Sequence, residues 1–351
     1  MNVTAPDPAL DIAIDGSLAR IRDRAVDLGP GFAALGAAIS RAARGGKRLR
    51  PALVLASFRA FGGGEPHASA VLSVGAAFEL LHAAFLVHDD VIDHDTVRRG
   101  VPNVSGEFRS RGLDQGADPD GAALLGDAAA ILAGDLLLHE AFRLIAMADV
   151  AAGTREHLLA LLDDAIFVSA AGELSDVEQS VSARAATRED ALATAYRKTA
   201  VYSFSAPLQA GALLGGATAD SQRVLAHAGG WLGLAFQLVD DLIGTFGSSD
   251  QAGREAGVDL REGKRTPLVA IARETMGGTR VDDVLVRART GPVAVRVAQR
   301  ELESSGARRR LIALIDETLG DVRSASRDAQ LPGPAGALLR ELADQVERRI
   351  P

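Results

Sequence analysis

Two short acidic segments hold the side chains best suited to chemistry. The first contains Asp89, Asp90 and Asp93 after an apolar run, and on a helix Asp89 and Asp93 share one face. Three carboxylates this close repel one another unless a cation neutralises them, and hard oxygen ligands are what magnesium prefers. The segment therefore predicts a magnesium site. A solvated acidic helix end is the alternative, which the preceding apolar run and the following Arg98-Arg99 pair disfavour.

A second acidic pair, Asp240-Asp241, closes another apolar segment far along the chain. A glycine-rich loop follows it, and then come Lys264 and Arg265. Two acidic pairs, each followed by basic residues, predict two helices that face each other across a cavity, with metal ions and a diphosphate between their ends. A pair of unrelated surface turns is the alternative.

Lysine is rare here, and each lysine lies inside a motif. The three are Lys47, Lys198 and Lys264, and the other basic side chains are arginines. Lys47 and Arg50 are three apart after a Gly-Gly pair, which predicts that they share a helical face close to a ligand. An ammonium group is a compact charge that suits a phosphate oxygen. A solvated basic turn, and for Arg197-Lys198 an ordinary exposed pair, are the alternatives.

Helices account for nearly the whole pattern. Apolar residues recur at three and four positions in segments 66–91, 124–145, 158–177 and 231–243. Alternating strand patterns are absent, so β structure is not expected. We find no fixed-period repeat and no low-complexity linker, so we expect one all-α domain over residues 1–351.

Composition narrows the class of protein further. The chain has no cysteine, which excludes disulfides and thiolate metal sites. Its net charge of −8 argues against a non-specific nucleic-acid binder. Residues 1–25 lack the apolar core of a signal peptide, and no stretch approaches the roughly 20 charge-free apolar residues of a membrane span. A soluble, cytoplasmic protein is expected.

Taken together and in this order, the motifs resemble those of the trans-isoprenyl diphosphate synthases. The resemblance runs from about Arg44 to Pro267. It implies a bundle of antiparallel helices around a deep central cavity, usually as a homodimer. It also implies that the chain joins isopentenyl diphosphate to an allylic diphosphate with the help of magnesium, with three ions expected in each site.

The same resemblance implies roles for individual residues. Metal ligands would be Asp89, Asp90 and Asp93 for two ions, and Asp240 for a third with Asp241 beside it. The allylic diphosphate would be bound by Arg98, Lys198 and Lys264, and isopentenyl diphosphate by Lys47, Arg50, His82 and Arg99. Thr199 and Gln237 would lie near the carbocation that forms when the allylic diphosphate departs.

Three positions depart from the family pattern. Gly244 stands where the second acidic motif commonly ends in Asp, which predicts weaker binding of the third metal ion. Arg254 replaces a usual Lys and keeps its charge. Glu173 occupies a position that is commonly Gln.

The length of the prenyl product is expected to depend on residues that precede Asp89 on the first long helix. Phe85 lies one turn, roughly 6 Å, before Asp89, and Leu81 about 12 Å before it. Ala84 is small and rotated by about 100° from Phe85, so the growing tail is expected to pass it and stop deeper. In the family that the chain resembles, a small residue at this place is compatible with twenty carbons. We expect geranylgeranyl diphosphate, with farnesyl diphosphate as the alternative.

Other functions of the same fold remain open. A terpene cyclase would share an Asp-rich helix but has no need of the isopentenyl diphosphate set. A non-catalytic subunit of a heteromeric synthase could lose acidic residues, and Gly244 is the one hint of that. A helical interaction scaffold would explain the periodicity but neither the two Asp pairs nor the placed lysines. No nucleophile–His–acid constellation or Gly-x-Ser-x-Gly motif points to another class of enzyme.

Overall fold

The structure, a computed structural model, describes residues 7–248, 251 and 257–351. Arg254 and residues 1–6 lie outside the described residues. The chain forms two compact units: residues 1–162 with 210–216, and residues 163–209 with 217–351. The expectation of a single domain with a central cavity stays a prediction.

Unit 1 is built around α4 (Ala68–Ile92), which packs against α6 (Pro119–Ala146), α3 (Leu49–Ala60) and α1 (Pro8–Val26). Phe78 is fully buried on α4. The remaining elements of this unit are α2 (Pro30–Ala42), η1 (Glu65–His67), β1 (Val97–Arg98), β2 (Val101–Pro102), α5 (Val104–Asp114) and the parts of α7 (Ala152–Val181) and α9 (Ala206–Leu214) that lie within it.

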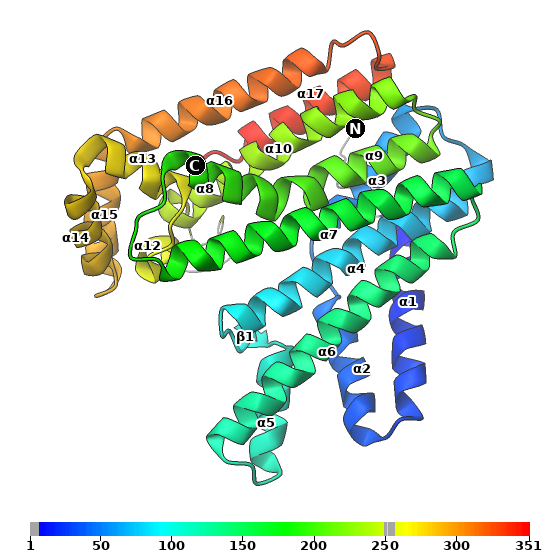
Figure 1. Cartoon of the computed structure of the whole chain (residues 1–351), viewed down its shortest axis with the longest axis horizontal. Coiled ribbons are helices and arrows are strands. Elements are labelled where there is room, and N and C mark those ends of the chain that lie inside the picture. Colours follow the sequence, from blue (N-terminus) through cyan, green and yellow to red (C-terminus); the bar gives the residue numbers. More distant parts are fainter. Residues whose placement is uncertain (1–6, 249–250, 252–256) are drawn as a thin grey trace. The chain divides into compact units, whose positions relative to one another are not determined.

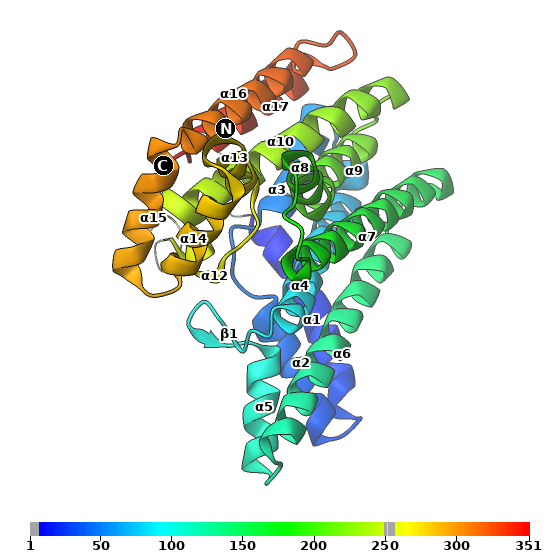
Figure 2. The ribbon, with the colours of Figure 1, turned by 60° about the vertical axis from the view of Figure 1, so that its left-hand side comes forward.

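A two-stranded hairpin corrects the expectation that no β structure forms. The strands β1 and β2 pair antiparallel, with Arg98 opposite Val101, directly after α4. The turn between them has positive φ at Arg99 (53°) and at Gly100 (78°). Such angles are typical of tight hairpin turns. Figure 2 shows the hairpin next to α5.

Unit 2 is built around α10 (Ala219–Phe246), which packs along α16 (Ala307–Ala325) and α17 (Gly333–Glu347), as Figure 1 shows. Helices α14 (Gly278–Ala288) and α15 (Pro292–Ser304) form a helical hairpin (Figure 2). The other elements are α8 (Arg188–Ala195), η2 (Tyr196–Ser205), α12 (Val258–Glu262), α13 (Pro267–Met276) and the remainders of α7 and α9.

Capping side chains mark the start of two of the long helices, α6 and α10. Asp118 accepts a hydrogen bond from the backbone N–H of Gly121 at the start of α6, and Thr218 accepts one from Ser221 at the start of α10. Each cap satisfies a backbone donor that the first turn leaves unpaired. All four predicted helices are present, and the all-α fold class is confirmed. The helices extend beyond the periodic segments because these caps lie outside them.

Two helices, α4 and α6, are long and apolar enough to cross a membrane by length and composition alone. This qualifies the expectation that no stretch approaches a span. In α4 the most apolar window is 72% buried, as in the core helix of a globular unit, whereas in α6 it is 39% buried. The exposed apolar surface of α6 therefore needs its own explanation.

Candidate functional site

The first acidic cluster lies at the carboxyl end of α4. The helix ends at Ile92, and Asp93 caps it with helical backbone angles. The backbone N–H of Asp93 donates to the carbonyl of Asp89 over 2.8 Å, so the two residues lie one turn apart. The shared face predicted for Asp89 and Asp93 is thus formed, with Asp90 between them and almost fully buried.

Arg98, on the hairpin, is the neighbour of this cluster. Its Nε donates to Oδ1 of Asp90 over 2.8 Å, and its Nη2 lies 3.5 Å from Oδ2 of Asp89. Burial raises the pKa of Asp90, and the hydrogen bond from Arg98 opposes that rise. The hairpin therefore places the guanidinium of Arg98 against Asp89 and Asp90, which precede it in the sequence.

Lys47 does not share a helical face with Arg50, contrary to the sequence expectation. Helix α3 begins only after Arg48, its N-cap, which has a left-handed φ of 50°. The preceding Gly45 and Gly46 have φ of 81° and 86°, in the region that favours glycine. Lys47 therefore lies on an irregular turn, because two consecutive left-handed glycines end any helical path before it.

The arginine at the hairpin turn reaches this glycine pair. A Cβ atom added at Gly45 would lie 3.5 Å from Nη1 of Arg99, and one at Gly46 would lie 3.8 Å from Nη2. The absence of side chains at both positions leaves room for the guanidinium against the backbone. The structure thus brings together two segments that are more than 50 residues apart in the sequence.

His82 lies close to several arginines of the same region. Burial lowers its pKa well below the usual value, and the positive charges of Arg50, Arg98 and Arg99 lower it further. The imidazole is therefore neutral at physiological pH. Three of the four residues predicted to bind isopentenyl diphosphate, Arg50, His82 and Arg99, are within electrostatic reach of one another.

Two residues of this region were missed by the sequence analysis. Arg48 donates from Nη1 to Oε1 of Glu79 over 2.9 Å, and Glu79 is 5% exposed. A Cβ at Gly46 would lie 3.9 Å from the same carboxylate oxygen. The buried carboxylate of Glu79 therefore lies close to the glycine turn and holds Arg48, which follows that turn. The signal in the sequence was a single acid within the apolar run of α4.

His88 packs α4 against α6. Its Nε2 lies 3.3 Å from the carbonyl oxygen of Ile131 and 3.6 Å from Oδ1 of Asp135. A Cβ at Gly134 would lie 2.0 Å from the same nitrogen, so a side chain at position 134 requires the imidazole to move. This accounts for a histidine that adjoins the acidic cluster without an assigned chemical role.

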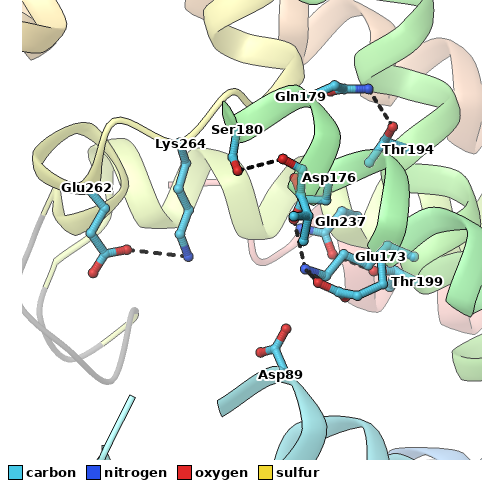
Figure 3. Close-up of polar contacts among 12 residues, drawn as sticks. Asp89, Glu173, Asp176, Gln179, Ser180, Thr194, Thr199, Gln237, Glu262 and Lys264 are labelled. Atoms are coloured by element: carbon cyan, nitrogen blue, oxygen red, sulfur yellow. Dashed lines mark hydrogen bonds and ion pairs between the residues drawn. The ribbon is translucent and has the colours of Figure 1, made fainter. Parts of the chain in front are cut away.

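In unit 2, Lys198 lies on the π-helical segment η2, and its ammonium group has two carboxylate partners. Nζ lies 3.1 Å from Oε1 of Glu173 and 2.8 Å from Oδ2 of Asp176, whose side chains Figure 3 shows. A Cβ at Gly172 would lie 2.4 Å from the backbone nitrogen of Lys198. The departure at Glu173 thus gives this lysine an additional negative partner. π-Helical turns often occur at functional sites.

A chain of side-chain hydrogen bonds joins η2 to α10. Oγ1 of Thr199 donates to Oε1 of Gln237 over 2.7 Å, and Nε2 of Gln237 donates to Oδ1 of Asp241 over 2.9 Å. Burial raises the pKa of Asp241 to about 8, and the nearby charges of Asp259 and Asp240 raise it as well. Thr199 and Gln237, predicted to lie near the carbocation, and Asp241, predicted to lie beside a metal ion, therefore form one connected network.

Asp240, on the same helix, forms an ion pair with Arg349. This arginine follows α17 and lies beyond the motif-bearing part of the sequence. No sequence pattern pointed to it, because an arginine 109 residues from its partner carries no local signal.

Lys264 and Gly244 meet at Asp259. Nζ of Lys264 lies 3.7 Å from Oδ1 of Asp259 and 3.4 Å from Oε2 of Glu262 (Figure 3). A Cβ at Gly244 would lie 1.8 Å from Oδ2 of Asp259, which is 5% exposed. The carboxylate of Asp259 thus fills the space beside Gly244, and a side chain at position 244 requires it to move.

Both acidic clusters suit magnesium bound together with a substrate. Among the described residues, no three Asp, Glu or His side chains converge as a ready-made cage for one ion. Magnesium commonly takes only one or two carboxylates and completes its shell with phosphate oxygens and water. The raised pKa values of Asp90 and Asp241 show that negative charge is costly in both clusters, which a divalent cation would relieve.

The residues predicted to limit chain length differ in exposure. Leu81 and Ala84 have no exposed surface, whereas Phe85 is partly exposed. A partly exposed Phe85 is able to meet a substrate tail. Ala84 is covered by packing in this structure, so the route past it stays a prediction.

Comparison with known proteins adds to this geometry. The polyprenyl synthetase family model matches residues 33–298. A geranylgeranyl diphosphate synthase from Sulfolobus acidocaldarius is 36% identical over 228 residues, and an octaprenyl diphosphate synthase from Escherichia coli is 33% identical over 226. Each match covers 64% of this chain and 62% of the relative, so it spans less than two thirds of those proteins.

A solved structure is similar over nearly its whole length. It is a geranylgeranyl pyrophosphate synthase from Corynebacterium glutamicum, complexed with isoprenyl diphosphate and magnesium. The two chains superpose with a TM-score of 0.86 at 28% sequence identity, covering 98% of this chain and 99% of that one. With a family model that matches most of the sequence, the chain belongs to the polyprenyl synthetase family.

Proposed function

We propose that the protein is a magnesium-dependent trans-prenyltransferase that condenses isopentenyl diphosphate with an allylic diphosphate. The observation that carries the proposal is the cationic region of unit 1, where the charges of Arg50 and Arg99 act on buried His82 and Arg99 also reaches the Gly45–Gly46 turn. A terpene cyclase has no second diphosphate to bind and no need of this region. The relatives named as prenyl diphosphate synthases support the same reaction.

Two sets of basic residues would bind the two diphosphates. Lys47, Arg50 and Arg99 would hold the diphosphate of isopentenyl diphosphate beside neutral His82. Arg98, Lys198 and Lys264 would oppose the negative charge that grows on the departing allylic diphosphate.

Magnesium held by Asp89, Asp93 and Asp240, up to three ions, would supply further positive charge to that leaving group. The allylic carbon–oxygen bond ionises, the double bond of isopentenyl diphosphate attacks the cation, and a proton leaves to the released diphosphate. Thr199 and Gln237, fixed by the hydrogen-bond chain to Asp241, would lie near the cation.

We propose geranylgeranyl diphosphate as the product, with farnesyl diphosphate as the alternative. Partly exposed Phe85, one turn before Asp89, supports a stop within this range. The relatives carry names for several product lengths, from geranylgeranyl to octaprenyl, so the length has to be measured on this chain.

We also propose a cytoplasmic homodimer. On α6, Leu124, Ile131 and Leu132 are 71%, 47% and 52% exposed, a run of apolar surface that a second copy would cover. Light scattering during size-exclusion chromatography should give twice the chain mass. Ile131→Asp should shift the protein toward the monomer, whereas a mass that stays at one chain for the wild type contradicts the dimer.

The reaction itself is tested with purified protein, labelled isopentenyl diphosphate and a series of allylic primers of five, ten and fifteen carbons. Chromatography of the extracted products gives their length. We expect labelled twenty-carbon product that requires added magnesium and disappears with chelator. Absence of product with every primer and metal would reject the proposed function.

A further inference from the structure

Arg349 lies against the second acidic cluster although it belongs to none of the family motifs. Its Nη2 donates to Oδ1 of Asp240. Its guanidinium also lies 4.2 Å from the centre of the Phe236 ring, one turn earlier on α10. The side chain is thus fixed by an anion and by an aromatic face on the same side of α10.

Contacts on both sides of Arg349 hold its segment in place. Within α17, Asp344 and Glu347 accept hydrogen bonds from Arg323 of α16 over 2.8 and 2.6 Å. After it, the carbonyl of Pro351 accepts from Arg308 over 2.7 Å. The position of Arg349 beside Asp240 therefore follows from the packing of α16 and α17 along α10.

One donor of this guanidinium has no protein partner. Nη1 of Arg349 is buried, and within the described part of the chain no group accepts a hydrogen bond from it. A buried donor of a charged group left unpaired is costly, so such a donor calls for an acceptor. The guanidinium fork can serve two anions at once, one for each amino group. A phosphate oxygen bound close to Asp240 would supply the negatively charged acceptor that this donor lacks.

We propose that Arg349 is a further diphosphate-binding residue, holding Asp240 through Nη2 and an oxygen of the bound diphosphate through Nη1. This inference rests on the proposed function, because the diphosphate is that of the substrate. A simple lock, in which Arg349 only neutralises Asp240 until a metal ion displaces it, is the competing role.

The test compares Arg349→Gln with Arg348→Gln, the neighbouring arginine, which is exposed. Calorimetry measures binding of inorganic pyrophosphate in the presence of magnesium, and electron paramagnetic resonance measures binding of Mn²⁺ alone. Loss of one charge-assisted hydrogen bond should weaken pyrophosphate binding about tenfold in Arg349→Gln. Arg348→Gln should bind as the wild type does.

Mn²⁺ alone should bind to Arg349→Gln as well as to the wild type or more tightly, because a competing cation is gone. Damage to the whole cluster would instead weaken both ligands, and the inference would then be rejected. Pyrophosphate binding that is unchanged in Arg349→Gln would assign Arg349 the role of a lock. Should that variant not fold, Arg349→Lys decides: a lysine keeps the charge but cannot reach both anions, so weakened pyrophosphate binding is still expected.

The two proposals fail in different ways. If the wild type does not bind pyrophosphate with magnesium, the proposed function is wrong. If the wild type binds it and both arginine variants do so equally, only the role of Arg349 is wrong.

Discussion

Paired aspartates lie at the carboxyl end of α4 and about one and a half turns before the end of α10, but their counter-charges come from different distances along the chain. At the end of α4, Arg98 reaches Asp90 from a hairpin eight residues further on. On α10, Asp240 pairs with Arg349, more than 100 residues away. A local hairpin can form as soon as α4 does, whereas the second pairing requires α17 to be packed in place.

Each pair has one buried aspartate, and the two buried members differ in their partners. Asp90 is 4% exposed and accepts a hydrogen bond from Arg98, whereas Asp241 is 6% exposed, accepts one from the neutral amide of Gln237, and has a pKa of about 8. Burial without a direct cation raises the energy of a carboxylate, so this group gains most from a bound metal or a proton. The comparison indicates that an arginine balances the charge of the buried aspartate of α4, whereas a neutral amide contacts the buried aspartate of α10.

Removal of either cluster should have the largest effect. Asp89→Ala and Asp240→Ala should each lower kcat/KM by roughly a thousandfold, since each removes a group that stabilises charge on the leaving diphosphate. Steady-state kinetics with labelled isopentenyl diphosphate measures this. Asp114→Ala, at an exposed helix end, serves as the control. Full activity of either variant, or full activity of the wild type in excess chelator, would contradict a metal mechanism.

Asp240 and Asp241 differ in burial, and this difference leads to a second prediction. Because burial holds much of Asp241 protonated near pH 7 in the metal-free protein, Asp241→Asn should cost less activity than Asp240→Asn. Measuring both variants side by side at pH 7 tests the ranking. The opposite order would show that Asp241 and not Asp240 carries the metal.

The next largest effects are expected from substitutions in the two groups of basic residues. Lys198→Ala and Lys264→Ala should chiefly lower kcat, by about ten- to a hundredfold, because their charges oppose charge that grows in the transition state. Lys47→Ala and Arg50→Ala should chiefly raise the KM for isopentenyl diphosphate. If all four variants change the same constant, the division of the two diphosphates is wrong.

A smaller effect is expected at Gly244. An added aspartate would normally be expected to strengthen metal binding, but a Cβ here meets Oδ2 of Asp259 at 1.8 Å. Gly244→Asp and Gly244→Ala should therefore both destabilise the fold, by about 1–3 kcal/mol for overpacking. Thermal melts measure this, with Gly320→Ala as the control, since a Cβ at Gly320 meets nothing within 4 Å. An unchanged melting temperature in Gly244→Ala would show that Asp259 moves freely.

Product length should change with little effect on rate. Phe85→Ala removes a partly exposed ring before Asp89 and should allow longer products, while Ala84→Phe should shift product toward fifteen carbons. Ala84 is fully buried, so Ala84→Phe also needs a check of its melting temperature. Products of unchanged length from both folded variants would mean that the tail follows another wall.

The sequence by itself determined four of the long helices and the residues of both acidic pairs, but not where those helices begin. Helical periodicity and the four-residue spacing of Asp89 and Asp93 are local properties, so a single sequence is enough to read them. The motifs and their order were also enough to indicate the family. Even the departure at Gly244 was visible as a missing carboxylate.

Only the tertiary structure decided what surrounds those residues. The turn at Lys47, the support from Glu79, the carboxylate of Asp259 beside Gly244 and the guanidinium of Arg349 at Asp240 all depend on contacts between distant segments. Buried charges need partners from wherever the fold brings them, and side-chain chemistry does not specify which segment that is. For this reason the two acidic pairs were predictable, whereas the residues that contact them were not.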